Sequence, residues 1–376
     1  GTSADGIDVA IVRFDNSAGS KPELIEFLEF PMPKKLSEPV LRLAEPGLNE
    51  IDRMGELDRA LAIAYAEAAR AILQSTGLKQ SDITAIGCHG QTVRHRPKAD
   101  YPFTMQIGCA ATLAERTGIT VVSDFRSRDI AAGGEGAPLV PFAHWQLFGQ
   151  KNENTAVLNI GGIANVTWLG CAGDITGFDT GPGNMVMDAL MLTTSHGKHA
   201  YDENGQLAAS GSVCLPLLDR LMQHPFLQRT PPKSTGREEF GEALVDTMMR
   251  WPNISDADRL ATACQFTVNS IKHSIRFMPG TPSRWLCCGG GVRNSHLMKL
   301  LEKQLAPSNV DTTEAAGMPP QAVEAVSFAL LARQTLMGKP NTLPPVTGAS
   351  HAVCGGQITP GNNWQELLQD IPAWIR

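Results

Sequence analysis

The sequence predicts an α/β protein built from two similar domains that face each other across a cleft. Its 376 residues exceed the size at which one hydrophobic core stops growing, so two domains are expected. Extended segments alternate with helical ones along the chain. A hairpin with a turn of small residues begins each half, at 1–8 and at 159–162. We expect one domain over 1–132, joined by the tail 340–376, and the other over 133–339.

The first domain opens with a turn of small residues that contains two carboxylates, Asp5 and Asp8. Strands are expected at 9–12 and at 24–30, where prolines end the second strand. The chain begins at Gly1 in the middle of this motif and without Met. We therefore expect some residues of an opening strand to precede Gly1.

Polar side chains follow two of the next predicted strands. The expected elements are a helix at 49–77, strands at 83–88 and 104–107, a helix at 109–117 and a strand at 120–123. The first of these strands leads into His89-Gly90-Gln91-Thr92, and the last into Asp124-Phe125-Arg126-Ser127-Arg128-Asp129. Because ligands of open α/β sheets lie at the carboxyl ends of strands, both segments are candidates for binding.

The central stretch of the second domain, beyond a glycine-rich crossing at 131–138, reads as a hairpin followed by a helix. It contains a strand at 156–160, a tight turn at Gly161-Gly162, a strand at 163–169, and a helix opened by 177–184. Paired glycines allow close approach to the main chain, and a helix start offers free N–H groups and a positive end. This combination suits a backbone cradle for phosphate. The plainer alternative is a hairpin and a capped helix without a ligand.

A third glycine-rich corner lies farther along the chain. The pattern predicts a helix at 256–277, a strand at 284–288, three glycines at 289–291 and a helix at 295–305. A strand, three bare backbone positions and a helix N-terminus again suit a phosphate or nucleotide. A helix at 319–337 carries Glu324 on its polar side, and a short helix at 364–371 ends the chain.

Composition restricts the classes of partner. The net charge is −6 and no run of Lys and Arg alternates with aromatic residues, so no nucleic acid is expected. No apolar run reaches about 20 residues, so no membrane span is expected. Eight cysteines without a CxxC pair fit reduced thiols in the cytoplasm, and a strand would separate Cys287 from Cys288. The spacing of His89 and His95 does not fit an HxxxH pair, so no protein-bound transition metal is expected.

Three segments with glycine turns, called here the glycine corners, lie in 1–8, at Gly161-Gly162 and at 289–291. Nucleotide binding depends on them, because GxxxxGK[ST] and a GxGxxG after a strand are both absent. The order of the corners resembles the superfamily of sugar kinases, heat-shock ATPases and actin, which have actin-like ATPase domains of the ribonuclease H-like type. Within it, six segments resemble the anhydro-N-acetylmuramic acid kinase family over nearly the whole chain. They lie at 1–8, 89–92, 124–129, 133–138, 159–165 and 177–188.

That resemblance implies ATP-dependent phosphorylation of the 6-oxygen of 1,6-anhydro-N-acetylmuramic acid, with opening of the anhydro bridge by water, in peptidoglycan recycling. It also implies Mg²⁺ as a cofactor beside ATP, a small sugar as substrate, and a homodimer. Two other hypotheses stay open. One is a conventional kinase of another amino sugar or hexose, in which Asp179 deprotonates a hydroxyl. The other is a non-catalytic, nucleotide-dependent scaffold like actin or a chaperone.

By the same resemblance, Asp179 is the base that activates water, and its place before a helix would keep it ionised; the alternative is a plain N-cap. The implied substrate contacts are Gln91, Arg126, Arg128, Asp129 and Glu324. Arg128, with Arg126 as the alternative, would pair with the lactyl carboxylate unless it forms a salt bridge to Asp124 or Asp129. The implied ATP contacts are Gly1, Thr2, Ser3, Ala4, Asp5, Gly6, Ile7, Asp8, Asn159, Gly161, Gly162, Gly289, Gly290, Gly291 and Asn294. Either Asp5 or Asp8 would order Mg²⁺ through water.

Overall fold

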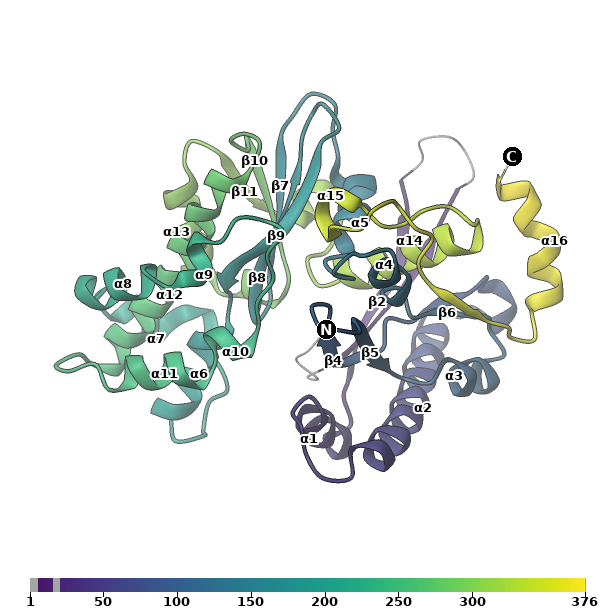
Figure 1. Cartoon of the computed structure of the whole chain (residues 1–376), viewed down its shortest axis with the longest axis horizontal. Coiled ribbons are helices and arrows are strands. Elements are labelled where there is room, and N and C mark those ends of the chain that lie inside the picture. The colour runs from purple at the N-terminus through teal and green to yellow at the C-terminus, as the bar shows by residue number, and fades with distance from the viewer. Residues whose placement is uncertain (1–5, 16–20, 376) are drawn as a thin grey trace. The chain divides into compact units, whose positions relative to one another are not determined.

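The computed structural model describes residues 6–15 and 21–375, and it divides the chain into two compact units (Figure 1). Unit 1 comprises Gly1–Leu147 and Glu324–Arg376, and unit 2 comprises Phe148–Val323. Both units combine strands with helices, so the α/β class predicted from the sequence is confirmed.

The boundaries between the units differ from those expected at 132/133 and 339/340. They fall near the end of α5 (Val140–Phe148) and at the start of α14 (Val323–Leu336). The helix α14 belongs with unit 1 because its Phe328 and Leu331 are buried in one cluster with Val122. Apolar packing on this helix therefore sets the second boundary, and that packing is not visible in the helical pattern itself.

The strands of unit 2 form one five-stranded sheet in the order β11-β10-β7-β8-β9. These strands are β7 (Thr155–Ile160), β8 (Ile163–Leu169), β9 (Ile175–Pro182), β10 (Arg284–Cys288) and β11 (Asn309–Thr312). The strands β7, β8 and β9 are antiparallel neighbours, while β10 runs parallel to β7 and to β11. This order and these directions are those of a ribonuclease H-like domain. Both faces of β7 are covered, since Ala156, Val157 and Leu158 are each 0% exposed.

The helices of unit 2 pack around the long helix α12 (Asp256–Ser274), which is buried on most sides. Leu260, Phe266 and Ile271 of α12 lie in the main apolar cluster together with Leu158 of β7 and Phe178 of β9. The other helices are α6 (Met185–Thr194), α7 (Gln206–Ser210), α8 (Leu215–Met222), α9 (Pro225–Gln228), α10 (Arg237–Phe240), α11 (Glu242–Met249) and α13 (Ser295–Leu305).

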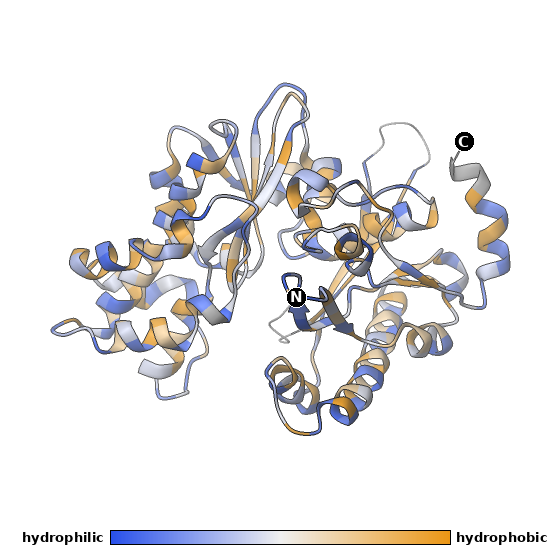
Figure 2. Ribbon diagram, in the orientation of Figure 1, coloured by the Kyte–Doolittle hydropathy of each residue, from blue (hydrophilic) through white to orange (hydrophobic). Residues whose placement is uncertain are grey.

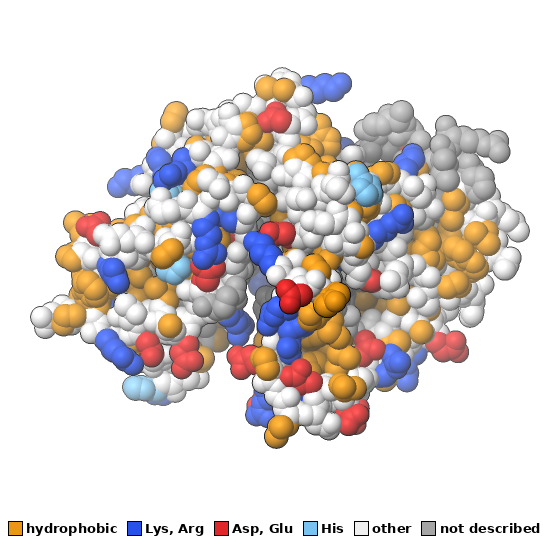
Figure 3. All heavy atoms as spheres, viewed as in Figure 1, with side chains coloured by type: hydrophobic (Ala, Val, Ile, Leu, Met, Phe, Trp, Pro, Cys, Tyr) orange, Lys and Arg blue, Asp and Glu red, His pale blue; other side chains and the backbone are white. Residues whose placement is uncertain are grey.

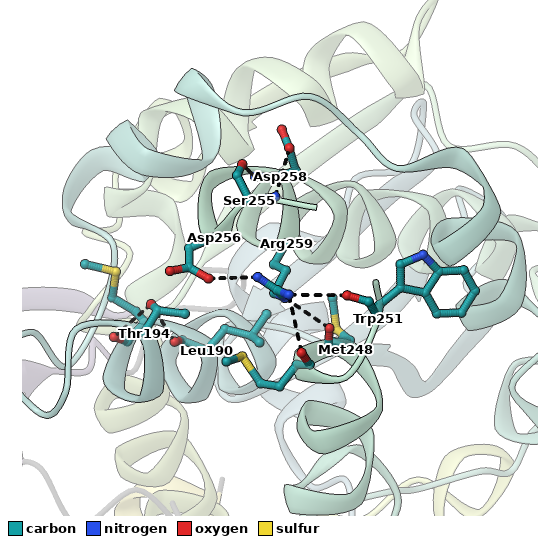
Figure 4. A network of polar contacts seen from close by, with 10 residues as sticks. Leu190, Thr194, Met248, Trp251, Ser255, Asp256, Asp258 and Arg259 are labelled. Carbon is teal, nitrogen blue, oxygen red and sulfur yellow. Dashed lines mark hydrogen bonds and ion pairs between the residues drawn. The ribbon is translucent and has the colours of Figure 1, made fainter. Parts of the chain in front are cut away.

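Arg259 of α12 links this helix by hydrogen bonds to the end of α11 and to the loop that follows it (Figure 4). Arg259 donates hydrogen bonds to the carbonyl oxygens of Met248 at 3.2 Å, Met249 at 3.3 Å and Trp251 at 3.3 Å. Its Nη1 also pairs with Asp256 at 2.8 Å. The carbonyl groups at the end of a helix have no partner within the helix, so this guanidinium supplies donors to Met249 and Trp251 and adds to the hydrogen bond that Met248 accepts from the Trp251 N–H.

The described residues of unit 1 form three small sheets. The pairs are β1 (Gly6–Arg13) with β2 (Glu23–Pro31), β4 (Gln91–Arg96) with β5 (Phe103–Ile107), and β6 (Val121–Ser123) with both β3 (Ile86–Gly87) and β12 (Gln357–Thr359). Because β12 comes from the tail and pairs antiparallel with β6, the tail is attached to unit 1 by backbone hydrogen bonds.

The long helix α2 (Glu50–Thr76) packs on the first of these sheets, with Leu57 and Leu61 in one cluster with Ile7. Apolar and polar segments alternate along α2 in Figure 2, and Gly77 ends it at a φ of 72°. The other helices of unit 1 are α1 (Lys34–Leu43), α3 (Ala110–Thr117), α4 (Ser127–Ala131), α15 (Pro344–Thr347) and α16 (Trp364–Ile375).

The surface carries both signs of charge. On the face drawn in Figure 3, acidic and basic side chains are interspersed. Within the described ranges, no helix has the length and apolar character needed to cross a bilayer.

Candidate active site

The glycine turn between β7 and β8 lies against the first turn of α6. The carbonyl oxygen of Gly161 accepts a hydrogen bond from the N–H of Asn184 at 2.8 Å. The carbonyl oxygen of Gly162 accepts from Gly183 at 2.8 Å and from Met185 at 3.1 Å. These three N–H groups therefore hold the hairpin in place, whereas the sequence had suggested that they stay free for a ligand. Gly162 itself is exposed.

The third glycine corner meets the carboxyl end of β7. Cys288, the last residue of β10, pairs with Asn159, and a Cβ on Gly289 would overlap the Asn159 side chain. A Cβ on Gly291 would overlap the side chain of Ile160, whereas no atom lies within 4 Å of a Cβ on Gly290. Two of the three predicted corners thus lie together in unit 2, at the carboxyl ends of neighbouring parallel strands.

Asn294, the last of the predicted ATP contacts, forms the N-cap of α13. Its side-chain oxygen accepts a hydrogen bond from the N–H of Leu297 at 3.0 Å. The cap fixes the start of the helix that follows the glycine corner.

Asp179 lies in a strand and not at the start of a helix. It belongs to β9 and pairs with Asn165 of β8, and α6 begins only at Met185. The expectation that a helix end would influence this carboxylate was wrong, because antiparallel pairing extends β9 as far as Pro182. Asp179 is also not an N-cap, so that alternative is removed.

The half-buried Asp179 is instead held by the segment 230–236. Its Oδ2 accepts a hydrogen bond from the N–H of Thr235 at 2.9 Å, and its own N–H donates to the carbonyl oxygen of Lys233 at 3.2 Å. In the sequence, this segment carries no motif that marks it as part of a site. Its role beside the carboxylate was missed.

The side chain of Lys233 is 6% exposed and lies among three aromatic rings. Its Nζ is 4.4 Å from the ring centre of Phe277, 4.7 Å from that of Phe226 and 5.7 Å from that of Phe178. Burial lowers the pKa of Lys233 to about 8, and the charge of Asp179 opposes that shift. Because the three phenylalanines come from different parts of the sequence, no local pattern marks this cage.

In unit 1, Arg126 binds groups of the protein with all three of its nitrogen atoms. Its Nε and Nη2 donate to Nε2 of His89 at 3.0 and 2.8 Å, and its Nη1 donates to the carbonyl oxygen of Gly136 at 2.7 Å. Burial lowers the pKa of Arg126 to about 10, opposed by the charges of Glu324 and Asp129, so the guanidinium stays protonated at neutral pH.

The side chain of His89 is a neutral imidazole, and its hydrogen-bond partners determine which ring nitrogen carries the proton. Burial, followed by the charge of Arg126, holds the pKa of His89 well below its ordinary value. A guanidinium has only donors, so Nε2 of His89 must accept. The proton is therefore on Nδ1, which donates to the carbonyl oxygen of Gly90 at 2.8 Å.

Asp129 is completely buried and supports the loop after α4. Its Oδ2 accepts from the N–H of Gly136 at 2.8 Å, and its Oδ1 accepts from the hydroxyl of Thr347 at 2.8 Å. Since Gly136 also binds Arg126, this carboxylate helps to place that guanidinium.

The other predicted sugar contacts differ in exposure. Arg128 is exposed, with one hydrogen bond to the carbonyl oxygen of Cys354 at 3.3 Å. Glu324 is exposed in the first turn of α14, and Gln91 is buried at the start of β4. Arg128 is thus the arginine of this segment whose side chain is open to a ligand.

The first predicted phosphate loop is described only in part. Gly6, Ile7 and Asp8 begin β1, and the carboxylate of Asp8 is exposed. Gly1, Thr2, Ser3, Ala4 and Asp5 lie outside the described residues.

Comparison with known proteins gives a match along nearly the whole chain. Residues 1–361 match the family model described as anhydro-N-acetylmuramic acid kinase. A protein of that name from Idiomarina loihiensis is 44% identical over 356 residues, 95% of this chain and 96% of that protein. One from Shewanella pealeana is 43% identical, with 96% and 97% covered. One from Xanthomonas campestris pv. campestris is 42% identical, with 96% and 95% covered.

Solved structures give a weaker likeness. A ROK hexokinase from Thermus thermophilus matches with a TM-score of 0.33 and 16% identity, over 87% of this chain and 100% of that chain. The activator of the 2-hydroxyisocaproyl-CoA dehydratase from Clostridium difficile has a TM-score of 0.33 at 15% identity, over 56% of this chain and 66% of that chain.

Proposed function

The chain belongs to the anhydro-N-acetylmuramic acid kinase family, and from this premise we propose that it phosphorylates 1,6-anhydro-N-acetylmuramic acid with ATP. Water opens the 1,6-anhydro ring in the same reaction, and the product is N-acetylmuramic acid 6-phosphate, an intermediate of cell-wall recycling. The observation that carries this proposal is the family match over residues 1–361. It favours a kinase of the anhydro sugar over a conventional kinase of another sugar and over a scaffold.

The chemistry requires a base for water and none for the acceptor. The O6 atom is an ether oxygen without a proton, so it becomes nucleophilic only as the C1–O6 bond breaks. Water attacks C1, a carboxylate takes its proton, and the C1–O6 electron pair moves to O6. The O6 atom then attacks the γ-phosphorus and the bond to ADP breaks. The products are the 6-phosphate with a hydroxyl at C1, ADP and one proton.

We infer that Asp179 is the base. Its Oδ2 is oriented by the Thr235 N–H, and a carboxylate has further lone pairs for the proton of water. A carboxylate near C1 also stabilises the positive charge that develops there as the bridge opens.

We place ATP on unit 2, at the glycine turn and the third glycine corner. Gly161, Gly162 and Gly290 expose main chain beside Asn159, which suits close approach of phosphate and adenosine. In unit 1, Gly6, Ile7 and Asp8 would contribute the described part of the first phosphate loop.

We assign recognition of the sugar to unit 1. Arg128 is open to solvent and would pair with the lactyl carboxylate in a fork, whereas Arg126 would support it from a fixed position. Gln91 and Glu324 would bind hydroxyl or amide groups of the sugar. Asp129 would act indirectly, because it holds Gly136, whose carbonyl oxygen binds Arg126.

We infer that Mg²⁺ enters with the nucleotide. It neutralises charge on the β- and γ-phosphates when bound. Magnesium usually keeps several waters and needs only one or two carboxylates besides phosphate oxygens. Asp8, with its exposed carboxylate, fits that requirement, and Asp5 is the other candidate. Among the described residues, no group of three or more His, Cys, Asp or Glu side chains is arranged to hold a metal ion.

We further propose a cytoplasmic homodimer. All eight cysteines are free thiols, which suits a reducing compartment where ATP is present. Leu48 and Ile51 are 92% and 81% exposed, and apolar side chains of this kind favour burial against a second copy. Light scattering of the purified chain should give the mass of a dimer, and the mass of a single chain would contradict the homodimer.

The proposed function is tested by turnover with ATP and three acceptors: the anhydro sugar, free N-acetylmuramic acid, and none. We expect ADP release that depends on the anhydro sugar and a sugar phosphate as the product. Equal or greater turnover with free N-acetylmuramic acid would favour the conventional kinase. Slow ATP turnover that no sugar stimulates would favour the scaffold.

A further inference from the structure

The segment 230–236 is fixed in two ways, by the caged side chain of Lys233 and by hydrogen bonds to Asp179. Lys233 inserts its ammonium among Phe178, Phe226 and Phe277, which come from β9, α9 and the turn of 3-10 helix at Ile275–Phe277. Two residues later, the N–H of Thr235 binds the Asp179 carboxylate. The same lysine accepts the Asp179 N–H at its carbonyl oxygen.

We propose that Lys233 is a positioning residue for the reaction: its caged ammonium holds the main chain at 233–235 against Asp179, and this contact fixes the orientation of the carboxylate toward water. The inference rests on the proposed function of Asp179. It adds a residue that touches neither sugar nor nucleotide and acts through the segment that it anchors.

The aromatic rings of the cage attract the ammonium of Lys233 and restrict its position, and this attraction offsets part of the burial that lowers the pKa of the amine. An ammonium over an aromatic face is attracted by the ring, and the attraction grows when water is excluded. Three rings around one nitrogen leave the side chain little freedom, so the backbone that carries it is restrained as well. A methionine of similar length would fill the space without this attraction.

Burying a lysine is unfavourable for folding, which makes a purely structural role a poor explanation. Taking an ammonium out of water costs free energy, and the rings offset only part of that cost. An apolar residue in this cage would give a fold at least as stable. The charge of Lys233 is therefore most simply explained by its role in holding the main chain at 233–235 against Asp179.

Several charged groups surround Lys233, and they affect its protonation in opposite directions. Asp179 of β9 favours the charged form, whereas Arg229 after α9 and Arg276 after α12 oppose it. Arg229 is itself paired with Glu239 of α10 at 2.7 Å. Burial lowers the pKa of His273 of α12, and the charges of Arg276 and Lys233 add to that shift.

The experiment compares Lys233→Met and Lys233→Arg with Lys151→Met, a change at an exposed lysine elsewhere in unit 2. For Lys233→Met we expect kcat with ATP and the anhydro sugar to fall about 10- to 100-fold, the effect of loosening one hydrogen bond to a charged group. The KM for ATP should change less than about twofold, since nucleotide contacts are untouched. Lys233→Arg should restore most of kcat, and Lys151→Met should match the wild type.

A second measurement does not depend on activity. In Lys233→Met, amide hydrogen exchange in the peptide that covers 233–236 should become at least about tenfold faster, because the anchored segment is released. A wild-type kcat in Lys233→Met would overturn the proposal. So would a reduced kcat with unchanged exchange in this peptide. If the wild type itself shows no turnover, the proposed function fails, and the exchange result still decides whether Lys233 anchors the segment.

Discussion

The buried carboxylate of Asp129 allows a quantitative test of how unit 1 positions its arginine. It accepts one hydrogen bond from the Gly136 N–H and one from the Thr347 hydroxyl, both at 2.8 Å, and it is 0% exposed. Hydrogen bonds to a charged group contribute about 1.5–3 kcal/mol each, so Asp129→Ala should lower the free energy of unfolding by about 3–6 kcal/mol. In that variant the buried Gly136 N–H would lose its acceptor, and the Thr347 hydroxyl would keep only the carbonyl oxygen of Leu343 at 3.4 Å.

Asp129→Asn should be milder. The amide oxygen can accept from Gly136 and the amide N–H can donate to the Thr347 hydroxyl, so both contacts are kept while the charge is lost. We expect Asp129→Asn to lower the free energy of unfolding by about 1–2 kcal/mol. Asp100→Ala is the matched control, since within the described chain its exposed carboxylate makes no hydrogen bond or ion pair. It should stay within about 0.5 kcal/mol of the wild type.

Urea unfolding gives the stabilities, and hydrogen exchange of peptides covering 126–137 locates the change. In Asp129→Ala, exchange at Gly136 should rise about 100-fold or more, as a loss of 3 kcal/mol requires. Sugar-dependent turnover should fall as well, because the Gly136 carbonyl also binds Arg126. If Asp129→Ala and Asp100→Ala unfold at the same urea concentration and exchange alike, the reasoning about this carboxylate is refuted.

Three further predictions concern unit 2. Asp179→Asn should abolish turnover, because an amide cannot take the proton of water, yet leave ATP affinity by calorimetry within about threefold; a wild-type kcat would remove Asp179 from the mechanism. Gly291→Ala should lower the free energy of unfolding by about 1–3 kcal/mol in urea, because its Cβ would overlap Ile160, whereas Gly290→Ala, with no atom within 4 Å, should match the wild type. From pH 7 to pH 10 the free energy of unfolding of the wild type should rise by up to about 3 kcal/mol relative to that of Lys233→Met. The folded pKa of Lys233, about 8, lies below its ordinary value of 10.5, so unfolding takes up a proton in that window; parallel pH profiles of stability would contradict this.

The sequence predicted the corners of unit 2 because their signals are local. Paired glycines at Gly161-Gly162 and three glycines at 289–291 follow β-branched or apolar strands, and both occur as turns at the carboxyl ends of β7 and β10. Strand and helix periods are also local, so α2 and α12 were placed to within a few residues.

Features that depend on distant contacts were not predictable in this way. The residues around Asp179 contain Gly and Pro, which read as a helix start, but pairing with β8 makes them a strand. The cage of Lys233 joins Phe178, Phe226 and Phe277, which no periodicity connects. Asp129 looked like a ligand-facing carboxylate because it follows a strand, yet Thr347 of the tail covers it.

The central claim, that water opens the ring while O6 takes the phosphate, is tested most directly by mass spectrometry of the product formed in ¹⁸O-labelled water. The reaction is sampled before the C1 hydroxyl exchanges with solvent, and unlabelled product kept in the same water for the same time is the control. We expect the label on C1 and none in the phosphate. Product without label on C1 would show transfer to an existing hydroxyl, and would contradict ring opening by water.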